Sequence, residues 1–329
     1  MVDSEVVVVT GASSGVGRAV ARAFGSRGAK VALIARNVEA LQACATEIRD
    51  AGGQALVCPA DVADAAAVDR SATAVEEQWG AIDIWVNVAM ATVFAPVKDT
   101  APEEYRRVTE VTYLGYVHGT LSALRRMLPR DRGTIVQVGS ALAYRSIPLQ
   151  SAYCASKAAV RGFTDSLRCE LIHDGSSVRL THVHLPAVNT PQSERQRNKM
   201  PKMQQPVPPM FTPESAAESI LWAAAHAPRE MLVGLPTHAA IWGQRLVPEL
   251  LDRHLAHAAW DPQLVDAPNE QKDDILFHTL PGDPGAHGPY TERERGPDLQ
   301  MRWRLNLVPA AAAAVLAVAA GAAVLFWRK

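Results

Sequence analysis

The chain has 329 residues and a mass of 35.4 kDa, enough for one large α/β domain with additions or for two small domains. Hydrophobic residues make up 48% and charged residues 20% of it, which excludes a wholly disordered, collagen-like or coiled-coil protein. The 33 Lys and Arg nearly balance the 34 Asp and Glu, and a net charge of -1 provides no field that would attract nucleic acid. The 4 cysteines are too scattered for a disulfide framework or a zinc cluster, so we expect no metal site.

Short apolar runs alternate with longer amphipathic segments through the first two thirds of the chain. The run VVVVT at 6–10 comes first and follows no secretory signal, so we expect this domain to stay in the cytoplasm. A helical pattern at 16–27, the run KVALIA and a second helical pattern at 38–51 follow. Such alternation requires a parallel sheet with helices on both faces and predicts a doubly wound, Rossmann-type α/β fold. The later segments are QALVCP, a helix at 65–79, IDIWVNV, a helical stretch at 103–128, GTIVQVGS, a helix at 151–173 and VRLTHVHLP.

The composition changes twice in the last third of the chain. A Pro- and Met-rich loop is expected at 190–212, followed by a helix at 213–227, the strand EMLVG and a helix at 239–258. From 260 to 297, Pro, Gly, Asp and Glu dominate, which is typical of an irregular extension or tether. The sequence therefore divides into an α/β domain at 1–258, an extension at 259–304 and a hydrophobic helix at 305–329.

The C-terminal segment has the pattern of a membrane-spanning helix. From Leu307 to Trp327 there are 21 uncharged residues. As a helix they would be about 30 Å long, the thickness of a bilayer core. Trp303 and Trp327 flank the segment, and arginines are more numerous before it than after it. We therefore predict a single-pass anchor in the lipid bilayer, with the α/β domain on the cytoplasmic side. The alternative is an Ala-rich helix that packs on a partner subunit, because alanine is only weakly hydrophobic.

A glycine-rich segment, TGASSGVG at 10–17, lies between the first strand and the first helix. Gly11, Gly15 and Gly17 let the backbone turn and approach a ligand closely, and the N-terminus of the helix presents free N–H groups. A tight turn between strand and helix also needs glycine for steric reasons alone. In this context the pattern predicts a site for a dinucleotide pyrophosphate.

This segment resembles the T-G-x3-G-x-G motif of the short-chain dehydrogenase/reductase family. The resemblance extends from about Val6 to Gly234 and implies a seven-stranded sheet and a nicotinamide cofactor. It also implies that Asp61 contacts the adenine and that Thr190 contacts the nicotinamide carboxamide. Family members often form dimers or tetramers, so a homo-oligomer is expected. The cofactor contacts expected by resemblance are Gly11, Ser13, Ser14, Gly15, Val16, Gly17, Arg36, Asp61, Val62, Asn87, Tyr153, Lys157 and Thr190.

The end of the second strand indicates which nicotinamide cofactor is bound. An NAD-binding protein has an acidic residue there for the ribose hydroxyls, whereas this chain has Ala35 followed by Arg36. A guanidinium suits the 2′-phosphate of NADP, and Arg18 adds a second positive charge. We therefore predict NADP as the cofactor, with NAD still possible. The plain alternative is that both arginines are solvated surface residues.

The segment YCASK contains the predicted acid–base pair. Tyr153 and Lys157 are four residues apart and so project from one face of a helix. A nearby ammonium favours the phenolate, so the pKa of Tyr153 is expected below the value of about 10 for free tyrosine. By resemblance, Lys157 also holds the nicotinamide ribose and Ser140 binds the substrate oxygen. The plain alternative is a packed tyrosine beside a solvated lysine.

Three departures from the family pattern affect the site. After the sixth strand, Pro186 and Ala187 stand where the family has P-G. Thr112 stands where the family has an asparagine that holds a proton-relay water, and we expect its hydroxyl to hold that water instead. The family's N-N-A-G after the fourth strand appears here as Asn87, Val88, Ala89 and Met90. Because the tyrosine and lysine remain, altered tuning is expected and not loss of chemistry.

The predicted function is an NADP-dependent oxidoreductase that interconverts an alcohol and a carbonyl, with Tyr153 as general acid and base. The Pro- and Met-rich segment 198–211 occupies the place of the family's substrate loop, and its adaptable apolar side chains suit a lipophilic substrate. A mobile loop that closes over any substrate is the alternative. A catalytically weak cofactor-binding sensor or membrane scaffold is the rival function. His182 and His184 are interpreted as core or edge residues because further metal ligands are missing.

Overall fold

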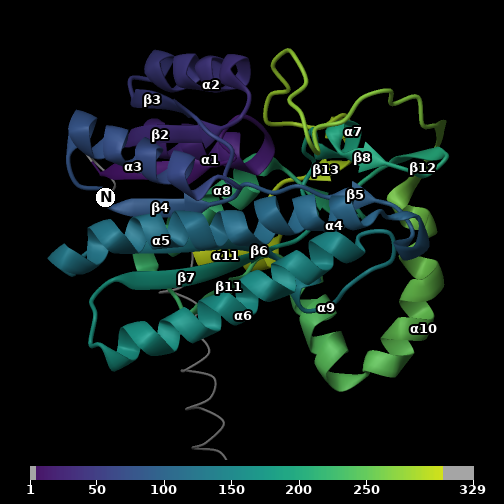
Figure 1. The fold of residues 1–329 in the computed structure, drawn as a ribbon. Helices are drawn as coiled ribbons and strands as arrows, with labels where there is room; N and C mark the ends of the chain where they lie inside the picture. Colours follow the sequence, from purple (N-terminus) through teal and green to yellow (C-terminus); the bar gives the residue numbers. More distant parts are fainter. Residues whose placement is uncertain (1–4, 307–329) are drawn as a thin grey trace, which may run out of the picture.

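The computed structural model describes residues 5–306, which form a central seven-stranded sheet. Every neighbouring pair of strands in this sheet is parallel, as Figure 1 shows. The predicted doubly wound α/β fold is therefore confirmed. In spatial order the strands are β11 (Glu230–Leu232), β7 (Arg179–Leu185), β6 (Thr134–Ser140), β4 (Ile84–Asn87), β1 (Val6–Thr10), β2 (Lys30–Ala35) and β3 (Gln54–Pro59).

Helices cover both faces of the sheet and create two apolar cores. In β1, Val7 and Val9 face one core, whereas Val6 and Val8 face the other. Successive side chains of a strand point to opposite faces, which explains why this strand is apolar throughout. The first core is covered by α1 (Gly15–Gly25), α2 (Val38–Asp50) and α8 (Pro213–His226). The second is covered by α3 (Ala65–Trp79), α4 (Pro102–Thr109), α5 (Gly115–Met127) and α6 (Ser151–His173).

The helix predicted at 239–258 is two helices. The first, α9 (Leu235–Leu246), ends two residues before Pro248, and α10 (Pro248–Ala258) begins at that proline. Proline lacks an N–H and disfavours a helical conformation of the residue before it, here Val247, so the chain changes direction. Pro248 was visible in the sequence, and the single-helix prediction was wrong.

The segment predicted as a loop at 190–212 contains short elements that pair with distant parts of the chain. Short strands β5 (Val93–Phe94), β12 (Leu264–Pro268) and β13 (Glu294–Arg295) are their partners. The segment is therefore held by the body of the protein and by the C-terminal extension. Its elements are α7 (Gln192–Arg195), β8 (Arg197–Asn198), β9 (Lys202–Gln204) and β10 (Met210–Phe211).

The extension from 259 onward is not a tether. Leu276 and Ala286 are 1% and 5% exposed, and each lies in one of the two apolar cores. In Figure 1 the extension runs along the top of the view between α2 and α7. It ends in α11 (Leu299–Asn306), which packs against α8. The few apolar residues of the extension are enough to hold it against the domain, because they are buried at separate positions in the two cores.

The predicted membrane-spanning segment at 307–327 lies outside the described residues. Within 5–306, none of the helices has the length and apolar character needed to cross a bilayer.

Candidate active site

A cavity of about 660 Å³ opens at the carboxyl ends of the parallel strands. This is the edge at which open α/β sheets bind ligands. The residues lining it come from the loops after β1, β2, β3, β4, β6 and β7, and from α6. The predicted site residues that line the cavity are Gly11, Ser13, Ser14, Gly15, Val16, Gly17, Arg36, Asp61, Val62, Ser140, Tyr153, Lys157 and Thr190.

The glycine-rich turn leaves space that only glycine provides. Gly11 and Gly15 have φ values of +71° and +54°, which other residues rarely adopt. A Cβ atom on Gly17 would lie 2.2 Å from the carbonyl oxygen of Gly11, closer than any real contact. Thr10 accepts hydrogen bonds at its Oγ1 from the N–H groups of Val88 and Ala89, which fixes the turn to the end of β4. The geometry fits a pyrophosphate at the N-terminus of α1.

Arg36 and Asp61 line the cavity at the ends of β2 and β3, where the adenosine is expected. Burial alone would raise the pKa of the Asp61 carboxyl, but the Ala63 N–H and the Arg107 guanidinium lower it. Arg36 is half-buried and donates to backbone carbonyls of the extension. Arg18 does not join it: its guanidinium is 2% exposed, pairs with Glu47 and Asp283, and is not among the cavity-lining residues. The second positive charge expected for a 2′-phosphate is therefore neutralised inside the protein.

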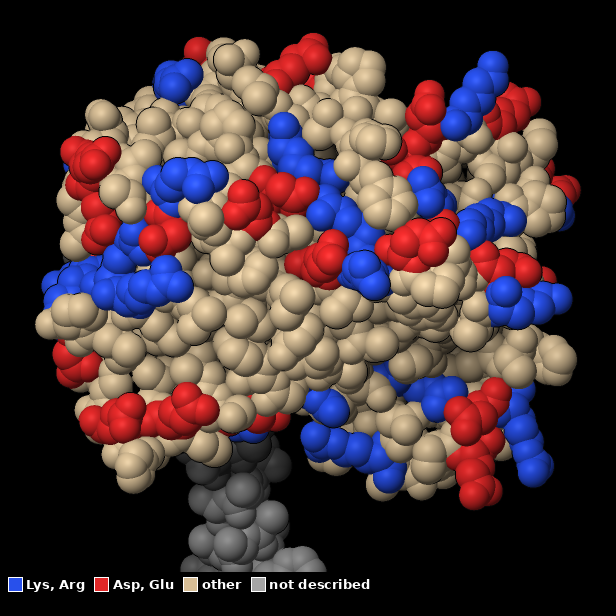
Figure 2. Space-filling model, in the orientation of Figure 1, with Lys and Arg blue, Asp and Glu red and all other residues tan. Residues whose placement is uncertain are grey.

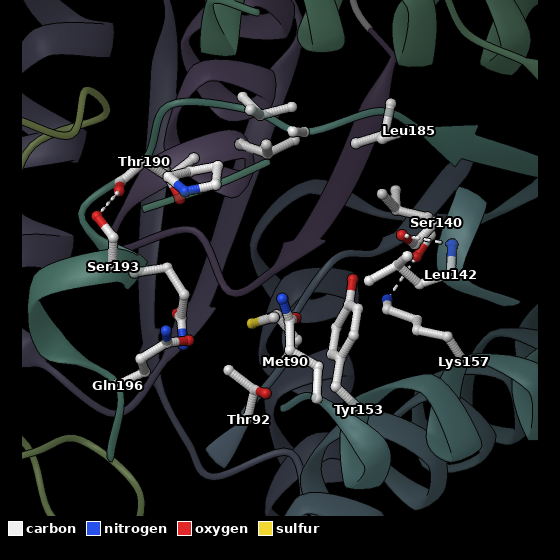
Figure 3. Close-up of a pocket in the computed structure, with 18 of the residues that line it drawn as sticks. Met90, Thr92, Ser140, Leu142, Tyr153, Lys157, Leu185, Thr190, Ser193 and Gln196 are labelled. Atoms are coloured by element: carbon white, nitrogen blue, oxygen red, sulfur yellow. Dashed lines mark hydrogen bonds between the residues drawn. The ribbon is translucent and has the colours of Figure 1, made fainter. Parts of the chain in front are cut away.

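Tyr153 and Lys157 project from α6 into the cavity near Ser140, as Figure 3 shows. The Lys157 ammonium lies 5.7 Å from the centre of the Tyr153 ring. Its Nζ donates to the Val138 carbonyl at 2.7 Å and to the Tyr116 hydroxyl at 2.8 Å. These bonds fix the lysine beside the tyrosine.

The expected lowering of the Tyr153 pKa is not found. Burial raises the pKa of Tyr153, while hydrogen bonding to Ser140 acts in the opposite direction. Burial also lowers the pKa of Lys157 to about 7, because an ammonium loses its hydration in the enclosed cavity. Enclosure therefore outweighs the attraction between the two groups, and it favours the neutral form of each.

Tyr116 is a site residue that the sequence reasoning missed. Its buried hydroxyl accepts from Lys157 and donates to Val138 at 2.8 Å. Burial raises its pKa well above the usual value, so it stays a neutral phenol. Its position four residues after Thr112, in a helical stretch that faces α6, was the only available signal.

Thr112 is not available for the predicted water. Its buried hydroxyl donates to the Ala91 carbonyl and accepts from the Ala91 N–H, both at 2.8 Å. It lies on the π-helical turn Glu110–Leu114 between α4 and α5 and does not line the cavity. A threonine side chain is too short to reach past the loop that it fixes, so its role is to hold Ala91 in place.

Asn87 is also outside the cavity lining. Its side chain accepts from Trp85 at 2.9 Å and donates to Gln137 at 3.0 Å, inside the fold. The amide is fully buried, so it is satisfied by the protein and cannot contact a cofactor in this arrangement. The prediction that Asn87 binds cofactor is therefore corrected to a structural role between β4 and β6.

A buried polar chain lies behind Ser140. His184 on β7 contacts the Ser140 carbonyl at 3.1 Å through Nδ1 and Glu230 at 2.8 Å through Nε2. These two contacts hold the ring between the end of β6, which carries Ser140, and Glu230 on β11. Burial alone would raise the pKa of Glu230, but hydrogen bonds from His184 and Tyr144 lower it to about 2. His182 and His184 are thus buried side chains, as expected, and His184 supports the backbone that carries Ser140.

The other half of the cavity is largely apolar. Segment 198–211 contributes three prolines, a valine and Gln204, and the helix pair α9–α10 contributes mainly aliphatic side chains, together with Thr237 and His254. The methionines of the segment do not line the cavity; Met210 is buried in the protein, at 1% exposure. The apolar lining residues of this half are Leu142, Ile147, Pro206, Val207, Pro208, Pro209, Pro236, Ala239, Ala240, Leu251, Leu255, Ala258 and Ala259.

Known proteins share both the sequence pattern and the fold. The family model "short chain dehydrogenase" matches residues 5–201. An uncharacterized oxidoreductase of Bacillus subtilis, YxnA, is 33% identical over 276 residues, covering 83% of this chain and 78% of that protein. The fatty acyl-CoA reductase of Acinetobacter baylyi is 29% identical over 242 residues, covering 73% and 79% of the two chains.

Two solved structures extend the comparison. A metagenomic short-chain oxidoreductase in complex with NADP is 30% identical, with a TM-score of 0.60, and the match covers 71% of this chain and 98% of that one. A Burkholderia phymatum enzyme in complex with NAD is 26% identical, with a TM-score of 0.66, and the match covers 77% and 95% of the two chains. The chain therefore belongs to the short-chain dehydrogenase family and is a nicotinamide-dependent oxidoreductase.

Proposed function

We propose that the protein is an NADP-dependent oxidoreductase that interconverts an alcohol and a carbonyl, with Tyr153 as general acid and base. The observation that carries this proposal is that Tyr153, Ser140 and Lys157 line the same cavity as the glycine-rich turn. The nicotinamide, when bound, supplies or accepts the hydride. A carbonyl or alcohol in the apolar half would lie between that group and the tyrosine.

Each residue of the chain then has a defined task. Ser140 holds the substrate oxygen, and Tyr153 gives a proton to it or takes one from it at Oη. Lys157 carries an exchangeable proton near neutral pH, because burial lowers its pKa to about 7. Tyr116 and the Val138 carbonyl hold the lysine in place, and the apolar lining excludes water from the proton transfer.

The preference for NADP is assigned to Arg36, because Arg18 is neutralised by Glu47 and Asp283. Arg36→Ala is expected to weaken NADPH binding about 10- to 100-fold, the range for hydrogen bonds to a charged group. NADH binding should weaken less, because NADH has no 2′-phosphate and is affected only by the loss of the Arg36 contacts with the carbonyls of Ile275 and Leu276. Fluorescence titration with both cofactors measures the ratio of the two dissociation constants.

Arg22→Ala is the control for this change. Arg22 is a half-exposed arginine of α1 that pairs with Glu47 and does not line the cavity. Its replacement should leave the ratio unchanged. Equal losses of NADPH and NADH affinity in Arg36→Ala would contradict the assignment of the phosphate to Arg36.

We further propose a lipophilic substrate and a membrane location. The apolar half of the cavity supports the first, as does the Acinetobacter relative whose name states a fatty acyl substrate. The uncharged segment 307–327 supports the second. So do three apolar side chains near the α9–α10 junction: Trp242, Leu246 and Leu250 are 51%, 73% and 64% exposed. The orientation with the catalytic domain in the cytoplasm and the homo-oligomer both stay predictions.

The charge distribution supports a small-molecule substrate more than a polyanionic one. Figure 2 shows basic and acidic side chains mixed on the visible face, including the lower right, where α9 and α10 lie in Figure 1. No large area of one sign is seen on this face, so electrostatic attraction of a polymer is not favoured.

A single comparison tests both parts of this proposal. The full chain and a chain ending at Asn306 are assayed with sterols, retinoids, long-chain aldehydes and small polar ketones, with the lipophilic compounds presented in phosphatidylcholine vesicles. The full chain should sediment with the vesicles and prefer a lipophilic compound by about tenfold or more in kcat/KM, whereas the shortened chain should stay in solution. Preference for the polar ketones would refute the lipophilic substrate, and equal sedimentation would refute the anchor.

A further inference from the structure

Residues 275–285, here called the strap, cross the adenosine half of the cavity. At their first end, the carbonyls of Ile275 and Leu276 accept hydrogen bonds from Arg36 at 2.5 Å and 3.5 Å. The Leu276 carbonyl also accepts from Arg107 at 3.0 Å. The Leu276 side chain is 1% exposed in the second apolar core, so this end is fixed by packing as well as by polar contacts.

The middle of the strap is bound to the start of α2. The side-chain amide of Asn37 donates to the carbonyls of Leu280 and Gly282 at 3.0 Å and 3.2 Å. The Gly282 N–H donates to Glu39 at 2.9 Å. Both contacts join the strap to the residues that follow β2, beside the predicted place of the adenosine ribose.

The last part of the strap reaches the glycine-rich turn. Asp283 pairs with the buried Arg18, whose other partner is Glu47. The Gly15 N–H donates to the Gly285 carbonyl at 3.1 Å. The strap is therefore attached at both ends and in its middle to the elements that surround the adenosine and pyrophosphate region.

The strap lines the cavity but does not fill it. Ile275, Thr279, Leu280 and Pro284 line the same cavity as the glycine-rich turn and Tyr153. A dinucleotide beneath them would be covered by backbone of this chain. It could not enter or leave past this side without breaking several of the contacts described above.

We propose that the strap is a cofactor-retaining element of the binding site, which must open for the dinucleotide to exchange. This rests on the proposed use of NADP. Cofactor dissociation then depends on the strap contacts, even those formed by residues that do not touch the cofactor. We expect cofactor release to be the slow step of each turnover for as long as the strap stays closed.

The test uses the full chain with two acids of the strap contacts neutralised, Asp283→Asn combined with Glu39→Gln. Neither residue lines the cavity, and Arg18 keeps its pair with Glu47, so the fold and the direct cofactor contacts remain. NADPH is bound, and its dissociation is followed by the loss of its enhanced fluorescence when excess NADP is added. The dissociation rate should rise about tenfold or more.

The matched control also neutralises two acids that form ion pairs, Asp266→Asn with Glu218→Gln. Asp266 lies in the extension outside the strap and pairs with Lys202, whereas Glu218 pairs with Arg27 on the outside of the protein. The control should dissociate NADPH at the rate of the unaltered chain. A strap variant with the same rate as the control would overturn the retaining role.

Hydrogen exchange gives a second measurement that does not depend on dissociation kinetics. NADP should slow exchange of the N–H groups of Gly282 and Gly285 in the unaltered chain, and less so in the strap variant. Unchanged exchange on adding NADP would overturn the proposal even if the cofactor binds. If neither NADPH nor NADP binds the unaltered chain, the proposed function fails, and the retaining role fails with it.

Discussion

Tyr153→Phe is expected to lower kcat/KM by about 10²- to 10⁴-fold, the range for loss of a general acid–base group. NADPH affinity should change little, because the ring stays on α6 and only the hydroxyl is removed. The measurement pairs steady-state NADPH oxidation, with the best substrate from the panel, with fluorescence titration of the cofactor. An effect on turnover alone assigns the hydroxyl to the chemical step.

Tyr113→Phe is the matched control for this change. The Tyr113 ring packs edge-on against Phe163, with ring centres 6.5 Å apart, and it does not line the cavity. It should retain full activity. If Tyr153→Phe also keeps full activity, Tyr153 is not the acid and base. If the unaltered chain binds NADPH but turns over no compound of the panel, the sensor or scaffold becomes the better interpretation.

Lys157→Met is expected to change how stability depends on pH and to reduce turnover. Burial lowers the pKa of Lys157 from 10.5 to about 7 in the folded protein. Between these two values the unfolded chain binds the proton that the folded chain has lost. The free energy of unfolding of the unaltered protein therefore rises with pH across this window, by at most about 1.4 kcal/mol per pH unit from this group.

The methionine variant lacks this contribution. The difference in unfolding free energy between the unaltered protein and Lys157→Met should therefore grow in favour of the unaltered protein from about pH 7 to pH 10. Urea unfolding of the cofactor-free proteins at several pH values measures it. Lys98→Met, at an exposed position, should show a constant difference. Parallel pH curves for Lys157→Met and the unaltered protein would contradict a lowered lysine pKa.

Local patterns allowed prediction of the sheet and the motif residues. The central strand β1 is short and apolar because both its faces are covered, and the glycine-rich turn follows it directly. Ser140 is the last residue of β6 and Tyr153 lies in the first turn of α6, so the short connection between these two elements places them close together. The sequence-based analysis identified these residues because their chemistry depends on spacing within a short segment.

The remaining features depend on contacts between distant segments, which spacing does not show. The side chains of Asn87 and Thr112 form their hydrogen bonds with residues of other elements, Gln137 and Ala91. Arg18 is paired with Asp283, 265 residues away. The Tyr153 pKa depends on how completely the cavity is enclosed. The segment from 260 to 297 is poor in apolar residues and is interpreted from sequence as an irregular extension or a tether, because composition does not reveal where its few apolar residues are buried.

The position of Asp283 has a practical consequence for shortened versions of the protein. The matched family region ends at residue 201, and the last strand of the sheet ends at Leu232. A protein trimmed soon after that strand would keep the whole sheet and Tyr153. It would nevertheless leave Arg18 with one acidic partner and remove Leu276 from the second apolar core. Crystallisation or activity screening of such a minimal domain would examine a more open and less stable binding site than the native one.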